Sequence, residues 1–232
     1  MKNKKSHNNN GLSSNQLKLL AVIFMTIDHI GYILFPGIIL FRIIGRLSFP
    51  IFAFAISEGC RHTRSRCYYL LTLALSAILF QIVYTFVTGS LIMNIFVTLT
   101  LSVLTIIIFD KTSNIHTKSA YAQFAIYAGI IFSLSELLPK IISGFYIDYG
   151  FFGILLPVWY YIGRTKKEQL LYFAIGLILL SGAVGAIQFF SLLSLPVIAL
   201  YNGRRGKMHL KWFFYTYYPL HLAVLHLISV II

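Results

Sequence analysis

The chain has 232 residues, of which 58% are hydrophobic and only 11% are charged. Soluble domains carry about 25% charged residues, so this composition excludes an ordinary soluble protein and indicates a polytopic membrane protein. The net charge of +13 does not indicate nucleic acid binding, because the basic residues lie in short clusters between apolar segments and not in one domain.

The chain begins with a polar stretch, residues 1–16, that contains three lysines and a run of asparagines. Such a composition cannot bury a core, so we expect a disordered basic cytoplasmic arm. Residues 17–232 are expected to form a single multi-span membrane domain. Its first span runs from Leu17 to Phe35, LKLLAVIFMTIDHIGYILF, which is long enough because a spanning helix needs roughly 20 mostly apolar residues.

The first span carries two polar residues, Asp28 and His29. An acid inside a span costs about 2.5–3.5 kcal/mol on insertion scales, so such residues normally face a protein interior or a wet cavity. Neighbours on a helix point about 100° apart, so one adjacent helix cannot satisfy both side chains. His29 suits proton transfer; the alternative is a structural ion pair of Asp28 with an arginine and a hydrogen-bonded His29 in the core.

The second apolar segment supplies candidate partners. Arg42 and Arg46 stand four residues apart on one helical face, and Gly45 allows a neighbouring helix to approach closely. Two cations exceed what one aspartate neutralises, which favours an anionic ligand or a developing oxyanion over a purely structural ion pair. We interpret the chain as a scaffold that holds both arginines near Asp28 and His29 inside the membrane.

The remaining apolar segments complete an all-α polytopic membrane protein. We expect about nine transmembrane or partly spanning helices around a polar intramembrane site. Short pieces are tolerated where they are buried in protein or line a wet cavity, which fits a reaction site better than a plain anchor. After the first, the expected helices are residues 42–58, 68–88, 91–109, 119–138, 149–162, 170–190, 191–200 and 212–232.

The distribution of lysine and arginine predicts the topology, because cytoplasmic loops carry an excess of them. All but three of the 19 basic residues fall in alternate regions between the expected helices, and the exceptions are Arg42, Arg46 and Lys140. The N-terminus is therefore expected in the cytoplasm and the C-terminus outside. This topology places the following residues in the outer half of the membrane: Asp28, His29, Arg42, Arg46, Asn94 and Asp148.

The last segment, KWFFYTYYPLHLAVLHL, carries Tyr218 and His221 in a run of aromatic residues. Such residues are typical of the membrane interface. His221 follows a helix-kinking proline and lies about 13 Å along its helix, near the membrane midplane. A role in the site and a buried structural hydrogen bond are its two interpretations.

Two basic clusters on the predicted cytoplasmic side are candidates for binding the phosphates of a donor such as a coenzyme A thioester. The positive-inside rule alone would also produce both clusters. The residues are Arg61 and Arg64 in RHTRSR and Arg204, Arg205 and Lys207 in YNGRRGK.

Three further polar residues have a structural alternative to a role in substrate binding. Glu58 ends the second apolar segment, where it can pair with the neighbouring arginines. Asn94 and Asp148 stand near helix ends, where N-capping is the default explanation.

Signatures of soluble enzymes are missing from the sequence. We find no Gly-rich phosphate loop, Ser-His-Asp signature or HExxH motif. The spacing of Cys60, His62 and Cys67 matches no common zinc pattern, so we expect no metal.

The chain resembles the TraX family of membrane acetyltransferases. The resemblance is carried, in the order of the family, by LKLLAVIFMTIDHIGYILFP, RIIGRLSFPIFAFAISEGCRHTRSRCYYL, IDYGFFG, ALYNGRRGK and FFYTYYPLHL. It implies an inner-membrane enzyme that transfers acetyl from acetyl-CoA to the N-terminal amine of pilin. It also implies site roles for Asp28, His29, Arg42, Arg46, Glu58 and His221.

We therefore expect a multi-pass membrane N-acetyltransferase that uses cytosolic acetyl-CoA and modifies an N-terminal amine of an exported or membrane-embedded protein such as pilin. The alternatives are a proton-coupled transporter or flippase and a non-catalytic assembly factor. The expected catalytic residues are Asp28, His29, Arg46 and His221. The expected substrate-binding residues are Arg42, Glu58, Asn94, Asp148 and Tyr218, and the cofactor-binding ones are Arg61, Arg64, Arg204, Arg205 and Lys207.

Overall fold

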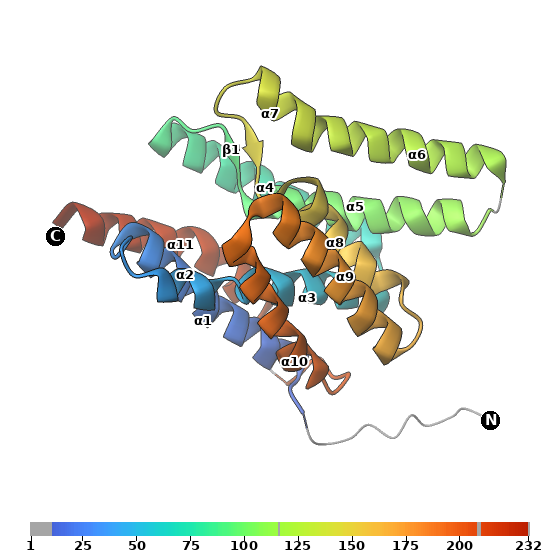
Figure 1. Ribbon diagram of the computed structural model, residues 1–232, viewed down its shortest axis with the longest axis horizontal. Coiled ribbons are helices and arrows are strands. Elements are labelled where there is room, and N and C mark those ends of the chain that lie inside the picture. The colour runs from blue at the N-terminus through green and yellow to red at the C-terminus, as the bar shows by residue number, and fades with distance from the viewer. Residues whose placement is uncertain (1–10, 116, 208–209, 232) are drawn as a thin grey trace. The chain divides into compact units, whose positions relative to one another are not determined.

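The computed structural model describes residues 11–115, 117–207 and 210–231 (Figure 1). Within these residues seven helices are long and apolar enough to cross a membrane, and two shorter apolar helices, Gly150–Ile162 and Ala186–Ala199, accompany them. The predicted class, an all-α multi-pass membrane protein, is confirmed. The seven candidate spans are Ser14–Ile33, Ile39–His62, Arg66–Phe86, Ile95–Ser113, Lys118–Ile141, Lys166–Val184 and Trp212–Ile231.

Contacts divide the chain into two compact units. The first unit consists of Met1–Ala55 together with Gly185–Ile232, and the second unit is Ile56–Val184. The boundary at residue 55 falls inside α3 (Ser48–His62). The prediction of a single domain for residues 17–232 stays a prediction. Besides its part of α3, the first unit contains α1 (Ser14–Ile33), α2 (Ile39–Gly45), the 3-10 helix η2 (Ala186–Leu193), α10 (Ser194–Ala199) and α11 (Lys211–Ile231).

The second unit is also built from helices. A two-stranded parallel contact joins β1 (Ile92–Met93) to β2 (Tyr146–Ile147). Ser102 donates hydrogen bonds to the carbonyls of Thr98 and Ile154, which fastens α5 to α8. The helices of this unit are α4 (Arg66–Thr88), α5 (Ile95–Ser113), α6 (Lys118–Phe132), the π-helix η1 (Ser133–Leu137), α7 (Leu138–Ile141), α8 (Gly150–Ile162) and α9 (Lys166–Val184).

The start of α1 is fixed by a capping box and by a loop from the far end of the sequence. Ser13 and Gln16 cap each other's backbone N–H groups. The N–H groups of Ser14 and Asn15 donate to the carbonyls of Arg204 and Arg205 at 2.8 and 3.0 Å. The helix therefore begins inside the stretch 1–16 that the sequence assigned to a disordered arm, and residues 1–10 of that arm lie outside the described residues.

Helices α1 and α2 pack closely because glycine lies at each contact. A Cβ atom added to Gly45 would lie 2.1 Å from Oδ1 of Asp28, and one added to Gly31 would lie 2.4 Å from Cβ of Phe41. Small residues allow such backbone approach between membrane helices. The role predicted for Gly45 is thus confirmed by the geometry.

Two expected helices are interrupted. The expected helix 42–58 breaks between Gly45 and Ser48, because Pro50 has no N–H to donate to the carbonyl of Arg46. The expected helix 170–190 ends at Val184, since Gly185 has φ of +127°, a conformation that other residues rarely adopt. The chain then continues as η2, a 3-10 helix of eight residues.

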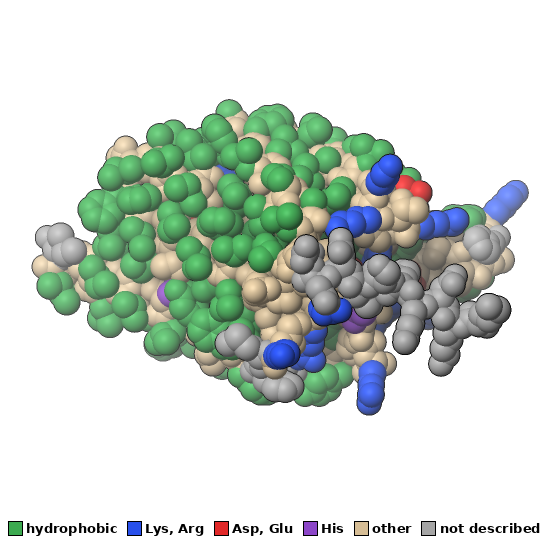
Figure 2. Space-filling model, turned by 90° about the horizontal axis from the view of Figure 1, so that it is seen from below, with side chains coloured by type: hydrophobic (Ala, Val, Ile, Leu, Met, Phe, Trp, Pro, Cys, Tyr) green, Lys and Arg blue, Asp and Glu red, His purple; other side chains and the backbone are tan. Residues whose placement is uncertain are grey.

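Large apolar side chains cover the outer faces of the helices. Phe86 of α4 is 92% exposed and Ile141 of α7 is 79% exposed. Apolar side chains dominate the face shown in Figure 2. A surface of this kind is unfavourable in water and suits the hydrocarbon core of a bilayer.

Gly45→Ala is predicted to destabilise the protein by about 1–3 kcal/mol, because the new methyl group overlaps the Asp28 carboxylate. Thermal unfolding in detergent measures the effect. Gly37→Ala is the matched control, since no atom lies within 4 Å of the added Cβ there. Equal melting temperatures for the two variants would contradict the close packing of α1 on α2.

Candidate functional site

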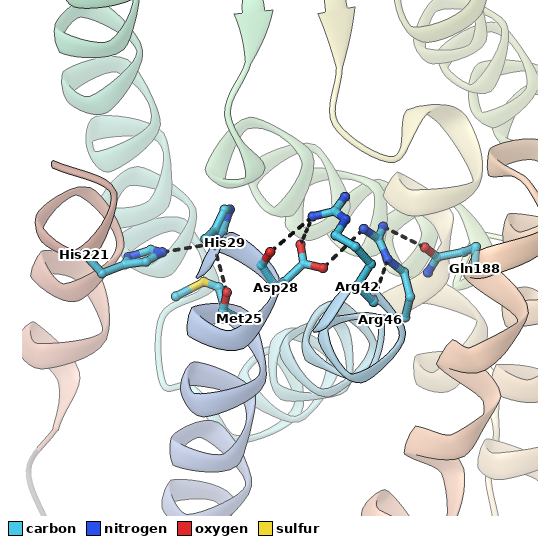
Figure 3. A network of polar contacts seen from close by, with 7 residues as sticks. All are labelled: Met25, Asp28, His29, Arg42, Arg46, Gln188 and His221. Carbon is cyan, nitrogen blue, oxygen red and sulfur yellow. Dashed lines mark hydrogen bonds and ion pairs between the residues drawn. The ribbon is translucent and has the colours of Figure 1, made fainter. Parts of the chain in front are cut away.

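An aspartate between two arginines forms the polar centre of the first unit (Figure 3). Oδ2 of Asp28 accepts from Nη1 of Arg42 at 2.8 Å, and Oδ1 accepts from Nη2 of Arg46 at 3.3 Å. We call these three residues the arginine–aspartate centre. The i, i+4 spacing of the arginines places both guanidinium groups on the same side of α2, facing α1.

Arg46 donates hydrogen bonds to three different residues. Its Nε donates to the carbonyl of Arg42, and its Nη1 donates to Oε1 of Gln188 on η2, each at 3.3 Å. Its side chain is 12% exposed, against 28% for Arg42. Arg46 therefore links α1, α2 and η2, and each of its three nitrogens already donates one hydrogen bond.

Arg42 keeps N–H groups for a ligand. Only its Nη1 donates to protein acceptors, the carboxylate and the carbonyl of Asp28. Its Nε and Nη2 have no hydrogen-bond partner in the described part of the chain, and the guanidinium lies 5.1 Å from the ring centre of Tyr32. Because one carboxylate faces two guanidinium groups, an excess positive charge remains beside Nε and Nη2 of Arg42.

His29 points to a different side of α1 from Asp28, toward His221 on α11 (Figure 3). Its Nδ1 lies 3.1 Å from Nε2 of His221 and 3.0 Å from the carbonyl of Met25. Nδ1 of His221 lies 2.9 Å from the carbonyl of Tyr217. We call His29 and His221 the histidine pair.

The carbonyl partners define the tautomers of the histidine pair, because a carbonyl can only accept a hydrogen bond. Nδ1 of His221 must carry hydrogen to donate to Tyr217, so Nε2 of a neutral His221 bears the lone pair. Nδ1–H of His29 then donates to Met25 and to His221. The lone pair of His29 is thereby on Nε2, which has no partner among the described residues.

Further contacts from α11 hold the histidine pair in place. The ring of Tyr217 stacks on His221 at 5.1 Å between centres, and its hydroxyl lies 2.7 Å from Oγ1 of Thr26. Tyr218, predicted to bind substrate, makes an edge contact with His221 at 5.7 Å. The structure thus joins α1 to α11 around the pair.

The loop of residues 202–207, called the basic loop, brings Arg204, Arg205 and Lys207 to the start of α1. Asp28 is the only acidic residue in the sequence of the first unit, so these cations have no carboxylate there to pair with. Lys18 adds a fourth cation, 5.7 Å from the ring centre of Phe214. A cavity of about 320 Å³ adjoins the loop and is lined by Ser13, Asn15, Gln16, Leu19, Gly206 and Lys207.

Two predicted residues of the second unit, Arg61 and Glu58, make structural contacts. Nη2 of Arg61 donates to the carbonyls of Tyr160, Tyr161 and Gly163, which caps the end of α8. The Glu58 carboxylate lies 3.6 Å from Nδ1 of His62, whereas the sequence suggested an arginine partner. Arg64 is exposed.

Asn94 has the structural role that its position suggested. Its side chain accepts from the N–H of Phe96 as the N-cap of α5 and donates to the carbonyl of Ala77. N-capping was also the default explanation for Asp148. The following helix, α8, has Tyr149 at its N-cap position, and the N–H of Phe151 donates to Oε1 of Glu136 at 2.8 Å. Burial and the carboxylates of Asp148 and Glu136 together raise the pKa of Tyr146.

Gln188, Thr26 and Tyr217 make contacts around the site that the sequence did not predict. Gln188 lies in a short apolar segment, where a single amide gives little signal. One signal could have indicated it: Gln188 is a polar residue in an apolar segment that also contains Ser191 and Ser194, and polar residues inside membrane spans are often functional. The contact of Thr26 with Tyr217 joins positions 191 residues apart, which spacing cannot reveal.

Comparison with known families matches residues 13–229 to the family described as TraX protein. The chain belongs to the TraX family. The predicted resemblance is confirmed, and the matched segment includes both the arginine–aspartate centre and the histidine pair.

Two relatives accompany this TraX match. The "Probable fimbrial assembly protein FimC, serogroup H1" of Dichelobacter nodosus is 25% identical over 252 residues, which cover 92% of this chain and 94% of that protein. An uncharacterized protein of Rickettsia prowazekii (strain Madrid E) is 31% identical over 157 residues, which cover 66% of this chain and 57% of that protein. No solved structure matches the chain.

Arg46→Met is predicted to cost more stability than Arg42→Met. Removing Arg46 leaves Gln188 and the partly buried Asp28 short of a donor. Breaking a fully buried pair costs about 3–5 kcal/mol, which is the upper limit here. Water reaches the more exposed Arg42 site and reduces the loss there. Melting temperatures of the two variants in detergent measure the difference, and the reverse order would show that Arg42 is the structural arginine.

Proposed function

We propose that this protein is a membrane N-acetyltransferase that moves the acetyl group of acetyl-CoA to the N-terminal amine of an exported or membrane-embedded protein such as pilin. The observation that supports it best is the histidine pair, which leaves the lone pair of His29 Nε2 available. A base of this kind is needed because an α-amine has a pKa of about 8 and is mostly protonated at neutral pH.

The transfer requires one new bond and one broken bond. The ammonium nitrogen first passes one proton to Nε2 of His29, which releases it to solvent. The neutral amine then attacks the thioester carbonyl, and the nitrogen passes a second proton to Nε2 of His29. When the tetrahedral intermediate collapses, the C–N bond remains and the C–S bond breaks. The proton then passes from His29 to the departing thiolate, so the products are an amide and coenzyme A. His221 acts as a positioning residue, because its Nε2 accepts from Nδ1–H of the protonated His29.

The two arginines have different roles in this proposal. The sequence favoured Arg46 for stabilising the oxyanion. The geometry favours Arg42, which is the more exposed arginine and whose Nε and Nη2 have no partner among the described residues. Each nitrogen of Arg46, by contrast, already donates to Asp28, Gln188 or a carbonyl. Two N–H donors on a cation suit the charge that develops on the thioester oxygen.

The basic loop is the proposed site for the phosphates of the donor. Arg204, Arg205 and Lys207 have no acidic partner in the described part of the chain, and backbone hydrogen bonds to α1 hold the loop in place. Arg61 is a weaker candidate, since three carbonyls occupy its Nη2 group. Under the predicted topology the basic loop faces the cytosol, where acetyl-CoA is found.

The proposed acceptor follows from the name of the Dichelobacter nodosus relative, a probable fimbrial assembly protein. A role in assembling surface fibres makes a pilin-like protein a suitable substrate class. The alternative of a proton-coupled transporter uses the same buried charges, and thiol release from acetyl-CoA by purified protein separates the two. Release of coenzyme A that depends on an amine-bearing acceptor peptide supports the enzyme, and its absence would reject it.

His29→Ala is predicted to lower kcat by about 10²–10⁴-fold, because a general base contributes this much to the rate. The melting temperature and the affinity for coenzyme A should change little. Coenzyme A release in the presence of an acceptor peptide is the assay. A folded His29→Ala variant that keeps more than about a tenth of wild-type turnover would exclude His29 as the base.

His221→Ala tests the positioning role. It should lower kcat less than His29→Ala does, and the double variant should be no slower than His29→Ala alone, because residues that act as a unit are not additive. Additive losses in the double variant would show that His221 acts independently of His29.

Arg204→Ala with Arg205→Ala is predicted to raise KM for acetyl-CoA about tenfold at low salt and by less at high salt, since ions screen exposed charges. The matched control is Arg64→Ala, an exposed arginine of the second unit. An unchanged KM in the double variant, or an equal rise in the control, would remove the basic loop from the donor site.

A further inference from the structure

The helix η2 carries a column of polar side chains on one side. Gln188 and Ser191 lie in η2, and Ser194 follows directly as the first residue of α10. The three residues are spaced three apart, and a 3-10 helix has three residues per turn, so their side chains lie on one side. Their exposed fractions are 1%, 0% and 0%. We call these three residues the polar column.

Each residue of the polar column has an unused hydrogen-bonding group. Nε2 of Gln188 and the hydroxyl groups of Ser191 and Ser194 are buried without a hydrogen-bond partner among the described residues. Serines in the α-helices behave differently, as Ser102 and Ser181 donate to the carbonyl four residues earlier. Buried polar groups are nearly always bonded, so three orphans on one face require an explanation.

The polar column begins at the arginine–aspartate centre. Oε1 of Gln188 accepts from Arg46 (Figure 3). Ser194 lies about 12 Å farther along at 2.0 Å per residue, and α10 then leads to Tyr201 and the basic loop. The column therefore extends from the proposed reaction centre toward the proposed phosphate site, both within the first unit.

The other side of η2 is apolar and exposed. Ile187, Phe190 and Leu193 are 38%, 41% and 54% exposed, as expected for side chains that meet lipid. The helix thus directs its polar side chains into the protein. A 3-10 helix of eight residues is unusually long, and such segments often mark a hinge. Gly185 precedes its first residue, and a Cβ atom added there would have no atom within 4 Å.

We propose that the polar column is a hydrogen-bonding track for the amide-bearing pantetheine arm of the acyl donor. The inference rests on the proposed acetyl-CoA donor. An amide and two hydroxyl groups match the amides and hydroxyl of that arm, which must connect phosphates at the basic loop with a thioester at the reaction centre. Entry of the arm requires η2 to move about Gly185, and the arm then supplies partners that the orphaned groups lack.

Binding of two probes to purified protein tests the track. Coenzyme A carries the arm, whereas adenosine 3′,5′-bisphosphate carries nucleotide phosphates without it. The variant Ser191→Ala with Ser194→Ala is expected to bind coenzyme A about tenfold more weakly, because two hydrogen bonds are lost. Its affinity for the bisphosphate should equal that of wild type. Calorimetry in detergent gives both affinities.

The stability of the ligand-free variants gives a second readout. Removing orphaned hydroxyl groups should raise the melting temperature by about 2–4 °C. Ser181→Ala is the matched control, since this serine is equally buried but bonded to Leu177, and its loss should lower the melting temperature. This control also accounts for the higher helix propensity of alanine, because it too replaces a helical serine with alanine.

Three results would overturn the track. They are unchanged coenzyme A affinity in the double variant, wild-type binding of coenzyme A no tighter than of the bisphosphate, and a melting temperature that falls in the double variant as in the control. Arm-dependent binding without acetyl transfer to any amine would support the track and reject the proposed enzyme.

Discussion

The first unit depends on how one partly buried carboxylate is neutralised. Asp28 is the only acidic residue in that unit's sequence, and a lone charge in a membrane span is costly. Arg42 and Arg46 both reach it. Their approach requires α2 to touch α1, and Gly45 removes the side chain that would prevent this. The charge requirement thus determines the packing of these helices.

The same neutralisation leaves an excess positive charge and hydrogen-bond donors on Arg42. Asp28 compensates one cation, and Arg46 is further occupied by Gln188, so Arg42 retains unused donors. Toward α11 the histidine pair leaves the lone pair of His29 Nε2 without a partner among the described residues. Adjacent residues of one helix therefore have different surroundings: Asp28 faces the arginines of α2, and His29, the proposed base, faces α11.

The candidate site could be predicted only in part. The sequence correctly indicated that Asp28 and His29 face different helices and that the arginines share a face, because helical periodicity fixes these directions. It did not indicate that Arg61 caps α8, since the three carbonyls it binds lie about 100 residues later in the chain. It also placed a continuous helix across Gly185, where the backbone leaves helical geometry.

The sequence by itself determined the membrane class, the family and the polar residues of the first span, because composition, apolar length and helical periodicity are local properties. Only the tertiary structure decided which polar groups meet. His29 and His221 are 192 residues apart, and their hydrogen bond exists because α11 packs on α1. Likewise the orphaned groups of η2 are visible only when burial and partners are known, since a serine in a sequence carries no record of whether its hydroxyl is bonded.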